Sequence, residues 1–211
     1  MNVTKRSAIA LVSAASLAAF GGFAFAETAA PPAIGKPVPG FTAKDSGGKT
    51  VSLSDFKGKT VVLEWTNDEC PFVRKHYGGR NMQALQKKWT DKGVVWLTVI
   101  SSPPGEQGYA DGPKAAKLTA ERDAAPTSVI LDPTGDIGRA YKALTTPHMY
   151  IVKGDGTLAY MGGIDDKPST KIEDLKGARN YVDQALTEMA EGKAVSMPTS
   201  RPYGCSVKFS S

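Results

Sequence analysis

Residues 61–77, VVLEWTNDECPFVRKHY, join an apolar run to a cysteine that is followed directly by a proline. The run over 61–65 is typical of a buried strand. Pro71 suits the first turn of a helix, where its missing N–H has no partner to lose. Cys70 therefore lies at a strand-to-helix junction, where free backbone N–H groups and the helix dipole stabilise a thiolate. We expect a reactive thiol that faces solvent, the alternative being a small cysteine buried in the core.

Outward from this junction the chain alternates between the strand and helix periods, and then ends in a hairpin and an amphipathic helix. Such an order predicts an α/β fold with a mixed sheet covered on both sides. The predicted strands are a hairpin over 41–53 that turns at 46–48, then 61–65, 94–100, 128–132, and a second hairpin of 148–152 with 158–163. The predicted helices are 70–89, 113–122, a short segment within 132–144, and 177–192.

The first 26 residues have the pattern of a signal peptide, with basic residues, an apolar run and the small-x-small site Ala24-Phe25-Ala26. We expect cleavage before Glu27 and a periplasmic or otherwise exported protein that is not an integral membrane protein afterwards. An uncleaved anchor is the alternative, because residues 7–26 are long enough to span a bilayer.

The mature chain is divided by composition into three parts. Residues 27–40 form a Pro-rich extended lead-in, residues 41–193 one domain, and residues 194–211 a tail that carries Cys205. The formal net charge of +5 is spread along the chain, so no nucleic-acid partner is expected. Export implies an oxidising compartment, in which the chain's two cysteines are expected to be paired or cycling.

Four stretches together resemble the thioredoxin-fold redoxins of the peroxiredoxin-like (alkyl hydroperoxide reductase/thiol-specific antioxidant) family, in an exported subgroup with a C-terminal cysteine tail. These stretches are 61–77, 128–152 (SVILDPTGDIGRAYKALTTPHMYIV), 158–166 (LAYMGGIDD) and 202–209 (PYGCSVKF). The resemblance implies a thioredoxin-like fold, with a central mixed sheet flanked by helices and an N-terminal β-hairpin.

The same resemblance implies roles for residues around Cys70. Glu64, six residues earlier, matches a buried acid that passes protons during thiol exchange, unless its strand lies at the sheet edge. Thr146-Pro147 matches a cis-proline that lies against the reactive cysteine and leaves the preceding backbone free for a substrate chain. Thr66, Pro71, Thr146 and Pro147 form the predicted substrate-binding set.

Arg74 lies on the helical face of Cys70, where it would stabilise a thiolate or orient a peroxide unless it is simply solvated. Two departures from the family pattern bear on the substrate. Val73 stands where thioredoxins have a second cysteine, so no local dithiol forms. Leu63 and Asn67 replace the proline and threonine that shape the peroxide pocket of typical peroxiredoxins.

We therefore predict a thiol-disulfide oxidoreductase in which Cys70 is the nucleophile and Cys205 resolves the intermediate. Its partners are a thiol or disulfide protein, or a hydroperoxide, and an external thiol reductant; no cofactor or metal is expected. Three alternatives remain: a thiol peroxidase that uses the same residues, a copper metallochaperone that uses His76 and His148, and a structural module whose disulfide closes a loop of about 135 residues.

Overall fold

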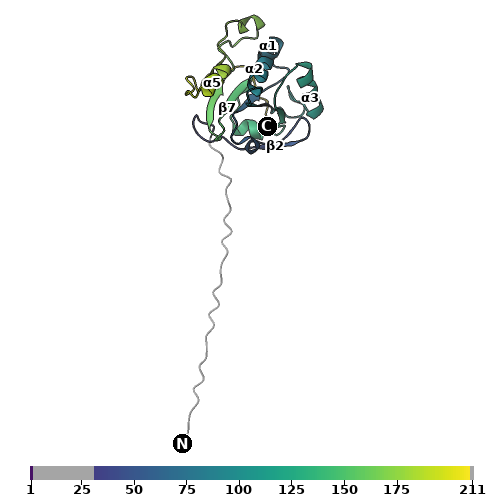
Figure 1. Cartoon of the computed structure of the whole chain (residues 1–211). Coiled ribbons are helices and arrows are strands. Elements are labelled where there is room, and N and C mark those ends of the chain that lie inside the picture. The colour runs from purple at the N-terminus through teal and green to yellow at the C-terminus, as the bar shows by residue number, and fades with distance from the viewer. Residues whose placement is uncertain (2–30, 210–211) are drawn as a thin grey trace.

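The computed structural model describes Met1 and residues 31–209 (Figure 1). Apart from Met1, the predicted signal peptide lies outside these residues, as does the start of the lead-in over 27–30. Within the described part of the chain, no helix is both long and apolar enough to cross a membrane.

A seven-stranded mixed sheet, in the order β2-β1-β5-β4-β3-β7-β8, forms the centre of the molecule. Its strands are β1 (Thr42–Asp45), β2 (Thr50–Ser52), β3 (Val61–Trp65), β4 (Val95–Ile100), β5 (Ser128–Leu131), β7 (His148–Val152) and β8 (Leu158–Gly162). A second, two-stranded sheet pairs β6 (Thr145–Thr146) with β9 (Cys205–Ser206). The helices are α1 (Pro71–Gly78), α2 (Asn81–Thr90), α3 (Gly112–Glu121), α4 (Asp136–Ala140) and α5 (Tyr181–Ala190), with 3-10 turns η1 (Leu53–Phe56) and η2 (Ile172–Leu175).

The strand β3 occupies the middle of the main sheet, parallel to β4 and antiparallel to β7. All five of its residues are buried, because both faces of the sheet are covered there. The strands β3, β4 and β5 run parallel, whereas β1 and the β7–β8 hairpin are antiparallel additions. The predicted mixed α/β sheet and N-terminal hairpin are confirmed.

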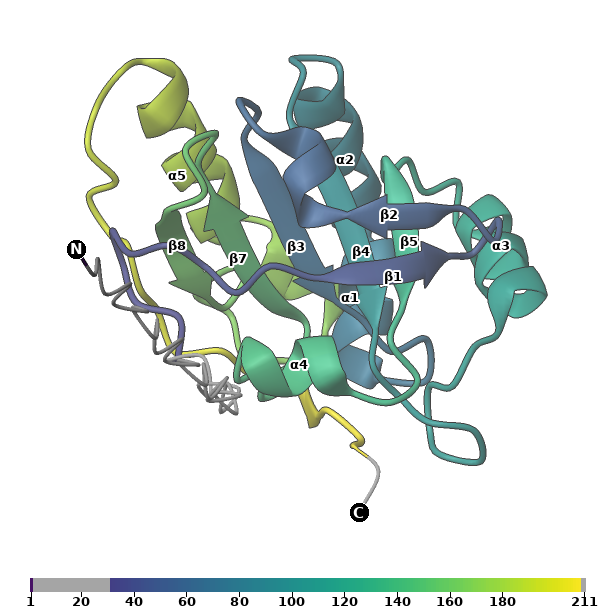
Figure 2. The same cartoon turned by 90° about the horizontal axis from the view of Figure 1, so that it is seen from below.

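Side chains of alternate parity on the strands enter the cores on the two faces of the sheet. On one face, Val62 and Trp96 pack with residues of α1, α2 and α5, including Val73 and Leu186. On the other face, Leu63, Trp65 and Leu97 pack with residues of α4 and of the N-terminal segment, including Ile137 and Phe41. Figure 2 shows α4 on the side of the sheet that faces the viewer, with α1, α2 and α5 behind it.

The predicted single helix over 70–89 is wrong, because the chain forms two helices there, α1 and α2. The break falls at Gly78-Gly79, and Arg80 then takes a left-handed conformation with φ of 58°. A Cβ atom on Gly79 would lie 2.2 Å from Leu175 Cδ1 and 3.1 Å from the Lys75 carbonyl oxygen. The glycines therefore allow η2 to pack closely against the end of the helix that begins at Cys70.

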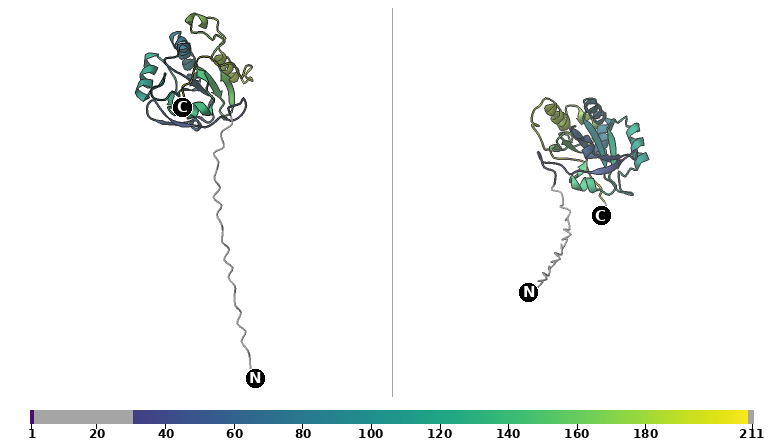
Figure 3. Two further views of the ribbon diagram at one scale, coloured as in Figure 1. Left: turned by 180° about the vertical axis from the view of Figure 1, so that it is seen from behind. Right: turned by 60° about the horizontal axis from the view of Figure 1, so that its bottom comes forward.

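Segments near the two ends of the described chain both reach the outer side of β8. Ile34 of the lead-in forms a parallel bridge with Leu158, and Thr199 of the tail bridges Met161. The tail then continues past β8 and below α4, as the yellow trace in Figure 2 shows; Figure 3 gives two further views of the molecule. This course brings the predicted resolving cysteine, Cys205, to the strand β6.

Candidate active site

Cys70 is the N-cap residue of α1, directly after β3 and a short turn. Its backbone N–H donates to the Asn67 carbonyl at 3.2 Å, and its carbonyl accepts from the Arg74 N–H at 2.9 Å. Its thiol donates to the Thr146 carbonyl, with 3.1 Å between sulfur and oxygen. The expectation that Cys70 faces solvent is wrong, because its exposed fraction is 0%.

The tail covers Cys70. Cys205 in β9 pairs with Thr146 in β6, the same residue whose carbonyl accepts from the Cys70 thiol. The preceding Gly204 has φ of +136°, and a Cβ atom there would lie 2.0 Å from the Thr146 carbonyl oxygen. A residue without a side chain is thus required for the tail to approach this backbone. Cys70 and Cys205 are far apart in sequence, but both contact Thr146.

The two thiols are free in this structure, and their surroundings shift their pKa values in opposite directions. Burial acts to raise the pKa of Cys70, but hydrogen bonds from the Cys205 thiol, the Val73 amide, Thr146 and the Cys205 amide together lower it below its ordinary value. Burial and the neighbouring Cys70 raise the pKa of Cys205 to about 12, against a small lowering by Lys208. At neutral pH Cys70 is therefore the better candidate for the thiolate.

Thr146-Pro147 is a cis peptide bond, as the resemblance implied. The Thr146 hydroxyl is buried and has no hydrogen-bond partner among the described residues. A thiolate would supply that partner, and the Thr146 side chain is among the groups that lower the pKa of Cys70. Thr146 thus contacts both cysteines, through its main chain and its hydroxyl.

Glu64 is fully buried beneath α1 and α2, on the same face of the sheet as Cys70. Tyr77 donates to its Oε1 at 2.8 Å, and Trp96 donates to its Oε2 at 2.8 Å. Gln86 and Thr98 also donate to Oε2. Burial raises the pKa of Glu64, while these four donors oppose the rise. Its strand is central, as expected for a buried acid, but its hydrogen bonds go to structural neighbours and none of those described goes to a cysteine.

The other predicted site residues lie at varying distances from this centre. Pro71 is the first residue of α1, directly after the nucleophile. Thr66 is buried and its hydroxyl has no hydrogen-bond partner among the described residues. Arg74 is exposed, and its Nε donates to the Asp68 carbonyl at 2.9 Å. The Arg74 guanidinium therefore caps the turn before α1 and is not among the groups that lower the pKa of Cys70.

The residues that depart from the family pattern have structural partners. Asn67 is buried, and its Oδ1 accepts from the Glu69 N–H at 2.9 Å, while its Nδ2 donates to the Gln107 carbonyl. Asn67 thereby joins the turn before Cys70 to the loop over 101–110. Leu63 points to the opposite core, and Val73 packs in the core beneath α1.

The two histidines do not form a metal cluster. His76 and His148 are both buried, on α1 and β7, and burial lowers their pKa values to about 3 and about 4, with Lys75 contributing at His76. Across residues 31–209, no three side chains of His, Cys, Asp or Glu gather as they would around a metal ion.

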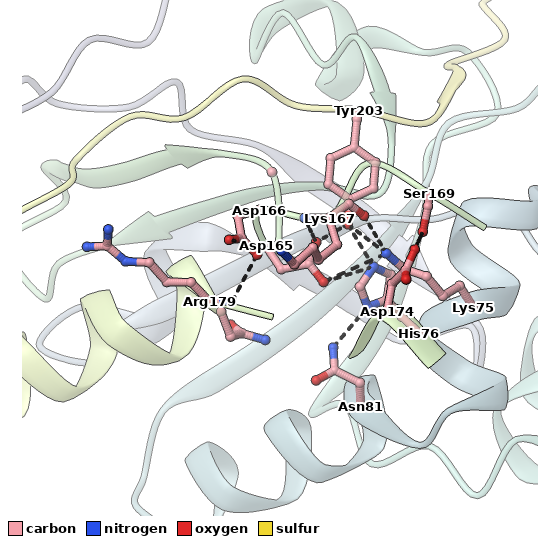
Figure 4. A network of polar contacts seen from close by, with 12 residues as sticks. Lys75, His76, Asn81, Asp165, Asp166, Lys167, Ser169, Asp174, Arg179 and Tyr203 are labelled. Carbon is pink, nitrogen blue, oxygen red and sulfur yellow. Dashed lines mark hydrogen bonds and ion pairs between the residues drawn. The ribbon is translucent and has the colours of Figure 1, made fainter. Parts of the chain in front are cut away.

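A buried polar cluster beside the site was not predicted (Figure 4). It joins Lys75 and His76 of α1 to Asp165, in the loop after β8, and to Tyr203 of the tail. The sequence offered one indication, since the stretches IDD and PYGC were part of the family resemblance. Their meeting with α1 depends on contacts about 90 residues or more apart in sequence and could not be inferred from local pattern.

The comparisons with known proteins agree with the fold and with the resemblance. Thiol-disulfide oxidoreductase ResA of Bacillus thuringiensis subsp. konkukian is 29% identical over 123 residues, which cover 58% of this chain and 65% of that protein. Probable glutathione peroxidase 5 of Arabidopsis thaliana is 31% identical over 91 residues, 41% of this chain and 51% of that protein. The chain thus matches less than two thirds of the length of either curated relative.

An uncharacterized conserved protein from Geobacillus kaustophilus has a similar crystal structure, with a TM-score of 0.72 and 25% identity over 84% of this chain and 93% of that one. The family model described as AhpC/TSA family matches residues 34–161, which is more than half of the 211 residues and includes Cys70 and Thr146-Pro147. With its thioredoxin-like fold and cis-proline beside the cysteine, this chain belongs to the AhpC/TSA family.

Proposed function

We propose that this protein is an exported thiol-disulfide oxidoreductase in which Cys70 is the nucleophile and Cys205 the resolving cysteine. The observation that carries the proposal is the convergence of both cysteines on Thr146: the Cys70 thiol donates to its carbonyl at 3.1 Å, and Cys205 is its partner in the β6–β9 pair. The ResA relative, a thiol-disulfide oxidoreductase by name, supports the reaction class. Export rests on the signal-like pattern of residues 1–26.

The reaction consists of two thiol-disulfide exchanges. The Cys70 thiolate attacks one sulfur of a substrate disulfide, forms a mixed disulfide and releases the other half of the substrate as a thiolate. The Cys205 thiolate then attacks the Cys70 sulfur, forms the Cys70–Cys205 disulfide and releases the second substrate thiolate. An external dithiol reduces this disulfide and is itself oxidised, which restores both protein thiols.

The opposed pKa shifts fit this order of attack. Cys205 remains protonated while Cys70 is a thiolate, since burial and the negative charge of Cys70 both raise the pKa of Cys205. Formation of the mixed disulfide removes that charge, and the pKa of Cys205 falls. Lys208, whose charge also lowers the pKa of Cys205, then favours the resolving thiolate. The first exchange thereby makes Cys205 a better nucleophile for the second exchange.

The test is a comparison of two serine variants of the mature protein with a model protein disulfide. Cys205→Ser is expected to form a stable mixed disulfide on Cys70, detected by mass spectrometry, but not to complete turnover. Cys70→Ser is expected to form none. Turnover of Cys205→Ser at the wild-type rate, with the same reductant, would remove Cys205 from the mechanism.

A thiol peroxidase is the second candidate, favoured by the similarity to a probable glutathione peroxidase. The Cys70 thiolate would attack a hydroperoxide, become a sulfenic acid and release an alcohol; Cys205 would then form the disulfide and release water. Leu63 and Asn67 are held in other contacts, so neither replaces the missing pocket residues. We expect peroxide oxidation to be slow beside disulfide exchange. Stopped-flow oxidation near the diffusional limit, roughly 10⁸ M⁻¹s⁻¹, would make the peroxidase the main activity.

A further inference from the structure

Residues 203–207 of the tail, which we call the arm, are held by hydrogen bonds on both sides of Cys205. On the C-terminal side, the Val207 N–H donates to the Leu144 carbonyl at 3.0 Å. On the N-terminal side, Tyr203 inserts its hydroxyl into the buried polar cluster shown in Figure 4. Because Cys70 is fully buried beneath this arm, a substrate reaches its sulfur only when the arm moves.

The Tyr203 hydroxyl uses all of its hydrogen-bonding capacity in the cluster. It donates to Asp165 Oδ1 and accepts from Lys75 Nζ at 3.2 Å and from His76 Nε2 at 3.1 Å. With its proton on Nε2, His76 accepts at Nδ1 from the Asn81 amide at 2.9 Å, so the whole chain of donors and acceptors is consistent. One hydroxyl on the arm therefore connects three buried groups of the folded domain.

Removing the Tyr203 hydroxyl from this cluster would leave buried charged groups with fewer hydrogen bonds and so cost free energy. The side chains of Lys75 and Asp165 are 0% and 1% exposed, and 3.8 Å separates Nζ from Oδ2. Asp165 Oδ2 has no hydrogen-bond donor among the described residues, so Asp165 depends on the bonds that its Oδ1 accepts from Tyr203 and from the Lys167 N–H. Buried polar groups that lose a partner are destabilised, which favours the closed position of the arm.

We propose that Tyr203 is a positioning residue that latches the Cys205 arm over Cys70 and so controls both the access of substrate and the rate of the resolving step. The inference rests on the proposed function. Lys75 and His76 belong to α1, the helix that begins at Cys70, so the latch and the nucleophile share one rigid element. Opening the arm admits the substrate, and closing it returns Cys205 to the Cys70 sulfur.

The test uses an aromatic disulfide that releases one coloured thiolate at each exchange. The first release reports attack by Cys70, which requires an open arm, and the second reports attack by Cys205, which requires a closed one. Tyr203→Phe removes only the hydroxyl. We expect the first release to become about 10-fold faster or more, and the second to become slower, as the loss of a hydrogen bond to a charged group implies. Simple destabilisation of the fold would not move the two phases in opposite directions.

Gly204→Ala opens the arm by another route, because its Cβ atom would collide with the Thr146 carbonyl, and should give the same opposed changes. Tyr109→Phe, a half-buried tyrosine outside the arm and the cluster, is the matched control and should leave both phases unchanged. If Tyr203→Phe does not fold, as judged by circular dichroism, Asp165→Asn weakens the same contact and should reproduce its effect.

Two further outcomes separate the latch from the proposed function. If Tyr203→Phe keeps both wild-type phases while Gly204→Ala changes them, the arm moves but Tyr203 does not hold it, and the inference is overturned. If the wild type releases its two coloured thiolates independently, without an internal disulfide, the resolving role of Cys205 fails instead.

Discussion

At the scale of single residues, the pKa values of the two cysteines shift in opposite directions because their neighbours differ. Cys70 lies where N–H and thiol donors converge, whereas Cys205 lies beside a sulfur that carries the negative charge first. The helix-start position of Cys70 was readable from the sequence, because Pro71 marks the first turn. The donors from Thr146 and Cys205 were not, since they come from residues more than 70 positions away.

Comparing Cys205→Ala with Cys205→Ser isolates the effect of the Cys205 side-chain hydrogen bond on the pKa of Cys70. Serine retains a donor toward Cys70 and alanine does not, so we expect the pKa of Cys70 to be higher in Cys205→Ala than in Cys205→Ser. The ultraviolet absorbance of the thiolate, titrated against pH, measures this difference. Equal pKa values in the two variants would mean that the hydrogen bond from the Cys205 side chain contributes nothing to the lowered pKa of Cys70.

Glu64 gives a second prediction, in the pH dependence of stability. Burial raises its folded-state pKa above the ordinary value of 4.5, so between these two pKa values the folded protein binds more protons than the unfolded chain. Stability is then expected to fall as pH rises from 4.5 through the folded pKa. In Glu64→Gln this fall should be absent, as measured by urea unfolding at a series of pH values. A fall of the same size in Glu64→Gln would assign it to other groups.

At the scale of elements, the junction between α1 and α2 shows where sequence pattern is insufficient. The apolar period continues across 70–89, so a single helix was predicted. The observed break depends on η2, a turn that arrives from nearly 100 residues later and packs where Gly79 has no side chain. The glycine pair carried the signal, but its cause is a tertiary contact.

Gly79→Ala is therefore expected to destabilise the protein by about 1–3 kcal/mol, the usual cost of overpacking, because its Cβ atom would collide with Leu175. Gly40→Ala is the matched control, since no atom lies within 4 Å of its Cβ position and its backbone has no positive φ. The urea midpoints of the two variants measure the difference. Similar midpoints would show that η2 moves aside without cost.

The strands were more predictable than this junction. Strands such as 61–65 and 148–152 are buried on both faces, so they consist mostly of apolar residues and can be recognised from the sequence. The turns at 46–48 and 154–156 combine glycine with polar residues, which is a local signal. The strands β6 and β9 have two residues each and exist only because the tail returns, so no local pattern indicates them.

At the scale of the whole molecule, the Cys70–Cys205 disulfide would close a loop of about 135 residues, nearly the entire domain. Chain-entropy models give roughly 5 kcal/mol of stabilisation for a loop of this length. We expect the oxidised protein to unfold at a clearly higher urea concentration than the reduced protein. Cys205→Ser should unfold at the same concentration under oxidising and reducing conditions. Equal midpoints for both wild-type forms would mean that the bond strains the folded state as much as it restrains the unfolded one.

The segments that flank β8 have a consequence for the behaviour of the protein in a crowded solution. An outermost strand with free N–H and C=O groups is a template on which other molecules add strands and aggregate. Here the lead-in occupies one part of that margin through Ile34, and the tail occupies another through Thr199. The same tail that brings Cys205 to the active site therefore also protects the sheet against self-association. A movement of the arm that extends back to Thr199 would make Cys70 more reactive, but it would also expose the edge of β8 and favour aggregation.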